Sequence, residues 1–202
     1  MTEYLGIFKM LKEEHQQFDV IQQHQLPHLK ERLGQYRTIL LPHLAQVDGE
    51  TIDLLAELQQ QGISIVATSK LDARIVQKLF SAKALDNGVH THSAYLETKG
   101  PIMKSFDRKG RIALEGGISE IEFAPETKTA LSFMTPAIYG PPERSGGHKE
   151  TQLAGVGIIE KGSSSHAYLP WEVGRLYYTL GFEDYKHAFF DVMGEIGPRI
   201  NC

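Results

Sequence analysis

Hydrophobic and polar residues in the first 85 positions follow two patterns in alternation. Apolar side chains recur at helical spacing between Tyr4 and His15, whereas the run from Thr38 to Leu41 is continuously apolar and β-prone, like a strand buried on both faces. These patterns predict helices at 4–15, 48–62 and 75–80, a short helix after Pro27, and strands at 18–21, 38–41 and 63–67. Alternating helices and strands are typical of a parallel sheet covered on both faces.

Beyond position 87 the pattern changes to period two, as at Ile121 and Phe123, which predicts antiparallel strands. Residues 135–152 carry three prolines and three glycines with little apolar content, which is typical of a long, mobile surface loop. Two more strands are expected at 156–160 and 166–169, and an amphipathic helix at 182–196. We therefore expect one domain of residues 1–202, with a parallel α/β half at 1–87 and a β-rich half with a closing helix at 88–202.

Composition and charge narrow the class of protein. A net charge of −4, from 21 basic and 25 acidic residues without long blocks, gives no electrostatic footprint for nucleic acid or for an anionic membrane. No apolar run approaches the roughly 20 residues that span a bilayer. Cys202 is the only cysteine, so no internal disulfide can form and a reducing compartment is expected. These features predict a soluble cytoplasmic protein.

The most distinctive stretch runs from Tyr168 to Tyr178 and holds the only tryptophan. An apolar strand stopped by Pro170 would deliver this aromatic and charged cluster onto a loop, where binding groups tend to lie. The same residues equally suit an aromatic packing plug, with an arginine hydrogen-bonded to nearby carbonyl groups. Both interpretations stay open. With the loop at 139–144 included, the candidate binding or interface residues are Glu143, Arg144, Trp171, Glu172, Arg175, Tyr177 and Tyr178.

On these segments the chain resembles the amidotransferase-like domain that follows the catalytic barrel in some glycoside hydrolases. It is similar, more distantly, to the trimerisation domain of bacterial β-galactosidases. The resemblance implies a flavodoxin-like, class I glutamine amidotransferase-like three-layer α/β sandwich with a β-rich C-terminal elaboration. The similar segments are 153–162, 167–175, the Pro-Pro-Glu loop at 141–143, and the early runs 4–7, 18–21 and 36–42.

Domains of this family begin with a strand before the helix that matches 4–15, and here Met1 stands only three residues ahead of that helix. In a doubly wound sheet the first strand is usually central, so its absence would leave unpaired edges on its two neighbours. We expect that the neighbours close up, that another segment fills the gap, or that a partner chain supplies a strand. The chain would then be a fragment of a longer enzyme or a shortened product that associates.

Catalytic and metal-binding patterns in the sequence are weak. Ser69 matches the position of the amidotransferase nucleophile, but neither a cysteine nor flanking glycines are present there, so we expect a helix cap or a turn residue. His90 and His92 share a strand face and would need His148 or His166 to complete a metal site. Chance pairing among nine histidines is the simpler explanation, and neither a metal nor another cofactor is expected.

The function implied by the resemblance is that of a non-catalytic accessory or oligomerisation domain of glycoside hydrolase type. Its expected partner is a second copy of the chain or a glycoside hydrolase barrel. One alternative is a carbohydrate-active hydrolase with a site shared between chains, in which Glu143 or Glu172 takes part. Another is a sugar-binding protein in which Trp171 stacks on a sugar while Glu172 and Arg175 bind its hydroxyl groups.

Overall fold

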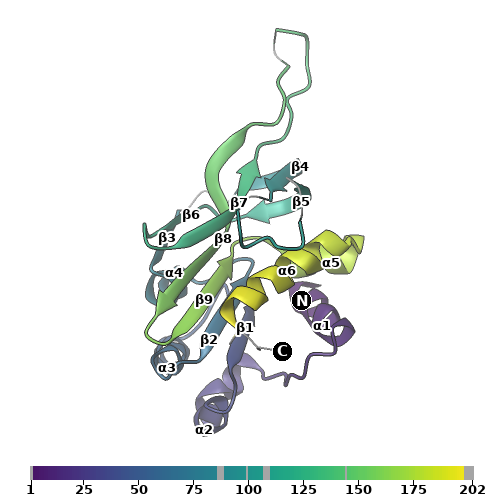
Figure 1. Ribbon diagram of the computed structural model, residues 1–202. Helices are drawn as coiled ribbons and strands as arrows, with labels where there is room; N and C mark the ends of the chain where they lie inside the picture. Colours follow the sequence, from purple (N-terminus) through teal and green to yellow (C-terminus); the bar gives the residue numbers. More distant parts are fainter. Residues whose placement is uncertain (1, 86–88, 99, 107–109, 144, 198–202) are drawn as a thin grey trace.

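The computed structural model describes residues 2–85, 89–98, 100–106, 110–143 and 145–197, and for residues 89–91 only the backbone. The chain forms a mixed α/β structure (Figure 1). Its helices are α1 (Thr2–Glu13), the 3-10 helix η1 (Gln23–Leu29), α2 (Lys30–Leu33), α3 (Gly49–Gln60), α4 (Ala73–Phe80), α5 (Val173–Leu180) and α6 (Glu183–Ile196). Its strands are β1 (Thr38–Pro42), β2 (Ser64–Thr68), β3 (Ala82–Ala84), β4 (Val89–Glu97), β5 (Arg111–Ile118), β6 (Ile121–Phe123), β7 (Lys128–Met134), β8 (Glu150–Lys161) and β9 (Ser164–Leu169). Within the described ranges, no helix is both long and apolar enough to cross a membrane.

Seven strands form the main sheet in the order β1-β2-β9-β8-β7-β4-β5, and β3 and β6 form a separate antiparallel pair. The strands β1, β2 and β9 are parallel, and the remaining neighbours are antiparallel. The sheet curls until the end of β5 meets the residues after β9. There Ile118 forms a bridge with Trp171, and the Ser119 N–H donates to the Pro170 carbonyl at 2.8 Å. The curled edge strand therefore covers the start of the segment that follows β9.

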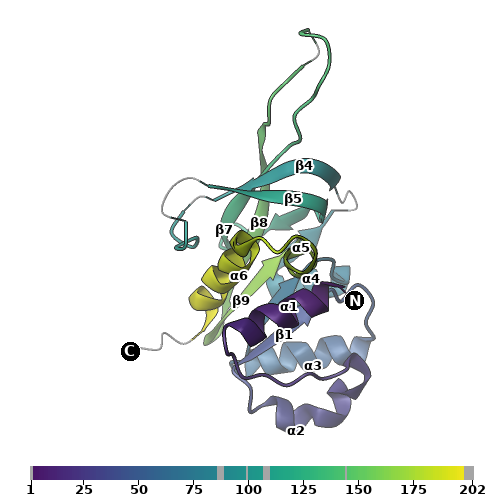
Figure 2. The same ribbon diagram turned by 90° about the vertical axis from the view of Figure 1, so that its right-hand side faces the viewer.

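Alternate side chains of the parallel strands enter different cores on the two faces of the sheet. On β2, Ile65 and Ala67 pack with α3 and α4, whereas Val66 packs in the core that contains α1, α5 and α6. Figure 2 shows α1 and α6 on the near side of the strands. Because both faces of β2 are buried, its middle residues 65–67 are continuously apolar instead of alternating.

The prediction of a mixed α/β structure is confirmed in this coarse form. The third parallel strand, however, comes from the second half of the chain, because Val66 of β2 pairs with Ala167 of β9. The strands β1 and β2 pair directly along their length, from Thr38 with Ser64 to Pro42 with Thr68. Among the described strands, none lies between β1 and β2.

Two local predictions are wrong. Residues 18–21 are irregular, and the Asp19 carboxylate there accepts hydrogen bonds from Arg32 Nη2 at 2.8 Å and from the Tyr36 hydroxyl. The loop predicted at 135–152 ends earlier, because β8 begins at Glu150 and pairs with Met134 of β7. The two strands continue their pairing up to the base of the loop.

A third prediction fails where the segment after Trp171 forms the helix α5 in place of a loop. The Glu3 carboxylate on α1 accepts hydrogen bonds from the N–H groups of Gly174 (3.2 Å) and Arg175 (2.7 Å), which otherwise lack partners in the first turn of α5. Burial raises the pKa of Glu3. The two helices touch through their backbones, because a Cβ added to Gly6 would lie 1.7 Å from the Gly174 carbonyl oxygen. A cap and two glycines on two helices thus fix α5 against α1.

Candidate functional site

Trp171 lies in the core and exposes none of its surface. Its indole Nε1 donates to the Gly155 carbonyl on β8 at 2.8 Å, and its ring lies 6.3 Å from that of Tyr185 on α6. Its own carbonyl accepts from the N–H of Ser69, which follows β2. In this conformation Trp171 presents no ring face to a sugar or to another chain, and it forms the packing plug that the sequence left open as the alternative.

Glu172 and Arg175 form an ion pair at the surface edge of this plug. Arg175 Nε donates to Glu172 Oε2 at 2.8 Å, and Arg175 Nη2 donates to the Glu115 carbonyl at 2.5 Å. Gly116 provides the space, because a Cβ there would lie 2.1 Å from Arg175 Nη2, and its φ of +115° favours glycine. The guanidinium therefore ties α5 to the edge strand β5, and the partly exposed faces of the pair remain available.

The two neighbouring tyrosines on α5 point in different directions. Tyr177 is buried, its hydroxyl donates to the Glu13 carboxylate, and Lys9 Nζ lies 4.8 Å from its ring centre. Tyr178 is 49% exposed. Of the aromatic residues predicted in this cluster, only Tyr178 offers a large exposed surface.

Ser69 and His43 lie at the carboxyl ends of the adjacent strands β2 and β1. Both residues adopt left-handed backbone conformations, with φ of +62° and +56°, and Ser69 Oγ is 3.0 Å from His43 Nδ1. The N-cap of α4 is Asp72, whose carboxylate accepts from Arg74 N, so the expectation that Ser69 caps a helix is wrong. Ser69 is a buried turn residue whose hydroxyl is held by an imidazole.

The histidines considered for a metal site lie in separate environments. His166 is buried, its Nδ1 accepts from the Ile65 N–H at 3.1 Å, and burial lowers its pKa to about 4. His148 Nδ1 is bonded to the Thr135 carbonyl at 2.8 Å, and its ring packs edge-on against Tyr95. The side chain of His90 lies outside the described residues. Across the part of the chain that the structure describes, no three potential ligand side chains gather into a metal site.

The loop between β7 and β8 leaves the body as a long arm, which is defined here as residues 135–149 (Figures 1 and 2). Backbone hydrogen bonds tie its two sides together, between Ile138 and Gly146 in both directions and from Thr135 N to the Lys149 carbonyl. Glu143 is exposed near the tip, and Arg144 lies outside the described residues.

The arm also carries the most exposed large hydrophobic side chains in the described part of the chain. Tyr139 is 88% exposed and Ile138 is 61% exposed. The sequence pattern indicated Glu143 and Arg144 as candidate residues in this loop and gave no such weight to Tyr139. The available signal was an isoleucine and a tyrosine next to each other in a stretch that is otherwise rich in proline, glycine and charge.

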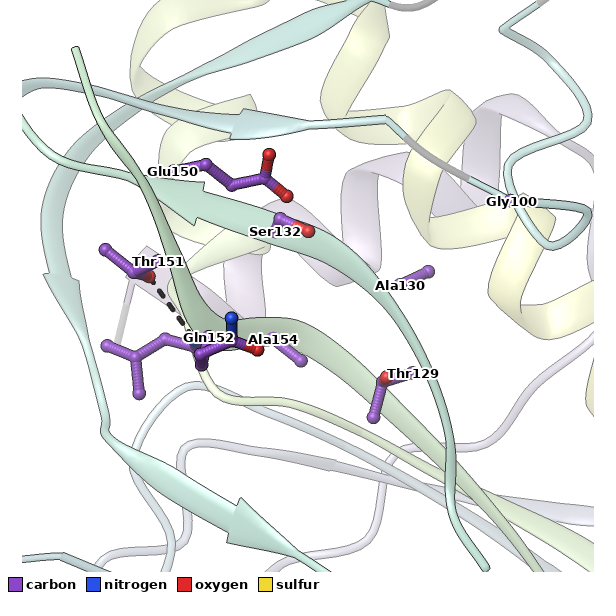
Figure 3. Close-up of a pocket in the computed structure, with 9 residues that line it drawn as sticks. Gly100, Thr129, Ala130, Ser132, Glu150, Thr151, Gln152 and Ala154 are labelled. Carbon is purple, nitrogen blue, oxygen red and sulfur yellow. Dashed lines mark hydrogen bonds between the residues drawn. The ribbon is translucent and has the colours of Figure 1, made fainter. Parts of the chain in front are cut away.

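A polar trough of about 530 Å³ lies at the root of the arm (Figure 3). The pairing of β7 with β8 is irregular beside it, because Leu131 has a φ of +61° and the register shifts from Ser132 with Ala154 to Met134 with Glu150, which leaves extra residues on β8. Hydroxyl, amide and carboxylate side chains line much of the trough, together with small apolar groups. The lining residues are Gly100, Thr129, Ala130, Ser132, Glu150, Thr151, Gln152, Leu153 and Ala154. Nothing in the hydrophobic pattern of the sequence indicated this hollow.

No known protein family and no curated protein matches the chain by sequence. Among solved structures, the chain is similar to a part of α-L-fucosidase isoenzyme 2 from Paenibacillus thiaminolyticus, with a TM-score of 0.71 and 16% identity over 96% of this chain and 29% of that one. It is also similar to Gan42B, a GH42 β-galactosidase from G. stearothermophilus, with a TM-score of 0.58 and 15% identity over 88% of this chain and 25% of that one.

A third similar structure is the cytoplasmic protein STM1381 from Salmonella typhimurium LT2, with a TM-score of 0.68 and 10% identity over 96% of this chain and 86% of that one. The chain thus spans less than a third of the fucosidase and the galactosidase, and most of the Salmonella protein. At these identities the likeness is one of fold. The same fold therefore occurs both as part of long glycoside hydrolase chains and as most of a short protein.

Proposed function

We propose that this chain is a non-catalytic accessory and assembly domain of glycoside hydrolase type, with a flavodoxin-like, amidotransferase-like fold. The observation that carries the proposal is the match of 96% of this chain to 29% of the fucosidase chain. A partner is either a second copy of the chain or a glycoside hydrolase barrel, and the compartment is the cytoplasm. The single cysteine at position 202 agrees with that compartment.

The proposed binding surface uses those residues singled out in the sequence whose side chains reach the solvent. Glu143 lies on the arm, and the partly exposed Glu172 and Arg175 lie with Tyr178 at the edge of α5. Arg144 is kept as a candidate by its place in the sequence alone. The other two, Trp171 and Tyr177, act from inside the core by holding α5 in place. Aromatic residues and arginine are enriched at interface hot spots, which favours assembly on this surface.

The hydrolase alternative needs two carboxyl groups roughly 5 to 9.5 Å apart. Within one chain, Glu143 lies on the arm, whereas Glu172 precedes α5 and is paired with Arg175, and the arm and α5 are well separated in both views (Figures 1 and 2). The sugar-binding alternative loses its stacking platform, because Trp171 is fully buried. The geometry of the single chain therefore favours assembly over sugar binding by Trp171, whereas a hydrolase site would need a second chain to bring two such carboxyl groups together.

The proposal is tested by two measurements on the purified chain. Light scattering over a concentration series is expected to show an oligomer, and p-nitrophenyl α-L-fucoside and β-D-galactoside are expected to remain unhydrolysed. Hydrolysis that disappears in Glu143→Gln or Glu172→Gln would instead establish the enzyme with a shared site. A monomer at every concentration would contradict self-assembly and restrict the partner to a barrel domain.

A further inference from the structure

The arm projects away from the body and carries apolar surface into solvent. Its two sides are joined by backbone hydrogen bonds between Ile138 and Gly146, and Ser145 N donates to the Pro141 carbonyl at 3.0 Å close to the tip. Tyr139, 88% exposed, makes no ring contact with another described residue. A large aromatic side chain exposed to water on a hydrogen-bonded hairpin is typical of an interaction surface.

The body of the same chain does not cover the exposed side chains of the arm, because the arm runs away from the body (Figures 1 and 2). The polar trough lies at the opposite end of the same arm, since Glu150 to Ala154 of its lining follow directly after Lys149. A volume of about 530 Å³ is within the range of pockets that hold small ligands, so a phenol ring fits. A tyrosine suits such a lining, because its ring packs on small apolar groups while its hydroxyl can bond to polar ones.

If two arms lie side by side in opposite directions, the tip of each reaches the root of the other. A two-fold axis between the arms makes both contacts at once, as in an isologous dimer. The arrangement also brings the exposed Glu143 near one tip toward the exposed Lys149 at the other root, so that unlike charges meet.

A contact made by the tips of the two arms alone would bury too little surface for a stable dimer. An aromatic side chain buries about 150–250 Å², so two Tyr139 rings supply roughly 300–500 Å² of the approximately 1,200 Å² that a stable interface needs. The flanks of the two arms must supply the rest, which requires the arms to pack along their length.

We infer that two copies of this chain exchange arms, with Tyr139 of each copy seated in the trough at the root of the other copy's arm. The inference rests on the proposed assembly function and names the partner and the surface. The trough is thereby assigned to a protein side chain of a second copy.

Two variants break the exchange from opposite sides. Tyr139→Ser removes the inserted ring, and Thr129→Tyr fills the trough from an exposed lining position. Light scattering over a concentration series is expected to show a dimer for the native chain and a dissociation constant at least tenfold higher for each variant. Val20→Ser is the matched control, because Val20 is 53% exposed but lies outside the arm and the trough, and it should leave the dimer unchanged.

Mixing the two variants gives the sharpest test. A mixed dimer contains one intact contact, the Tyr139 of the Thr129→Tyr chain in the open trough of the Tyr139→Ser chain, whereas either variant alone contains none. Native mass spectrometry of an equimolar mixture should therefore show the mixed dimer in excess over both self-dimers, which also shows that both variants fold.

The failures of the two proposals are distinguishable. A native dimer that survives both substitutions would overturn the arm exchange and leave assembly through another surface. A native monomer would overturn the exchange and self-assembly together, while a barrel partner would still be compatible with the accessory function. Two weakened variants that do not recover on mixing would show that the contact is not reciprocal, which also overturns the exchange.

Discussion

The segment 168–178 and the arm are similar in composition, but the aromatic centre of the first is buried in the core and that of the second is exposed to solvent. Both combine aromatic residues with proline, glutamate and arginine. The first continues the inner strand β9, and Trp171 is fully buried, with its Nε1 donating a hydrogen bond to the Gly155 carbonyl on β8. The second connects two strands beyond the end of their pairing, and Tyr139 is almost fully exposed. Whether such a segment is buried in the core or exposed as an interaction surface therefore depends on its position relative to the sheet and not on its composition.

The largest expected effect follows from the burial of Trp171. Trp171→Ala should lower the free energy of unfolding by about 3–5 kcal/mol, because it leaves a cavity and an unpaired carbonyl at Gly155. Tyr139→Ala, measured below the concentration at which the chain associates, should change it by no more than about 0.5 kcal/mol. Urea unfolding measures both free-energy changes. It is followed by circular dichroism and not by tryptophan fluorescence, because Trp171→Ala removes the only tryptophan. Equal losses in the free energy of unfolding for the two substitutions would contradict the contrast between a buried Trp171 and an exposed Tyr139.

A smaller effect is expected from His166, on the strand that leads into the buried segment. Its pKa is lowered to about 4 by burial, whereas in the unfolded chain it is about 6.5. Between pH 6.5 and 4, His166 is therefore protonated in the unfolded chain but stays neutral in the folded chain. Stability should fall as the pH decreases from 6.5 to 4, by about 2–3 kcal/mol in total.

His166→Asn separates this protonation from other acid effects. An asparagine keeps an acceptor oxygen for the Ile65 N–H but has no titrating group in this range. Unfolding midpoints at a series of pH values should show a shallower loss in the variant than in the native chain. The same slope in both chains would mean that His166 does not hold its neutral form in the folded state.

Much of the fold could be predicted from the sequence where the pattern is local. The buried strands β1 and β2 show as apolar runs, and Asp48 marks the start of α3, where its carboxylate accepts from Thr51 N at 2.7 Å. The pairing of Val66 with Ala167 could not be predicted, because it joins strands about a hundred residues apart and depends on the curl of the whole sheet.

The candidate site was predictable only in part, for a related reason. An aromatic cluster can be read from the sequence, but the side of the sheet that it faces depends on α5, which Glu3 caps from the other end of the chain. The trough lies beside the register shift between β7 and β8 at Ser132 and Met134, where no glycine or proline marks the strands. Tyr139 stands out only once the arm is seen to leave the body.

The smallest effects are expected from glycines, and they sharpen the same comparison. Gly174 in the buried segment contacts α1 through its backbone, and a Cβ there would lie 2.2 Å from the Glu3 carbonyl oxygen. Gly174→Ala should therefore cost about 1–3 kcal/mol, even though alanine is the better helix former. On the arm, a Cβ at Gly147 would meet no atom within 4 Å, and Gly147→Ala should change stability by no more than about 0.5 kcal/mol.

The control for helix propensity is Gly194 on α6, where an added Cβ also meets no atom within 4 Å. Gly194→Ala should raise the free energy of unfolding by about 0.5–1 kcal/mol, because alanine loses less backbone entropy in a helix. The sign of the change thus differs between two helical glycines only because one of them touches another backbone. If Gly174→Ala were stabilising like Gly194→Ala, α1 and α5 would not be in backbone contact.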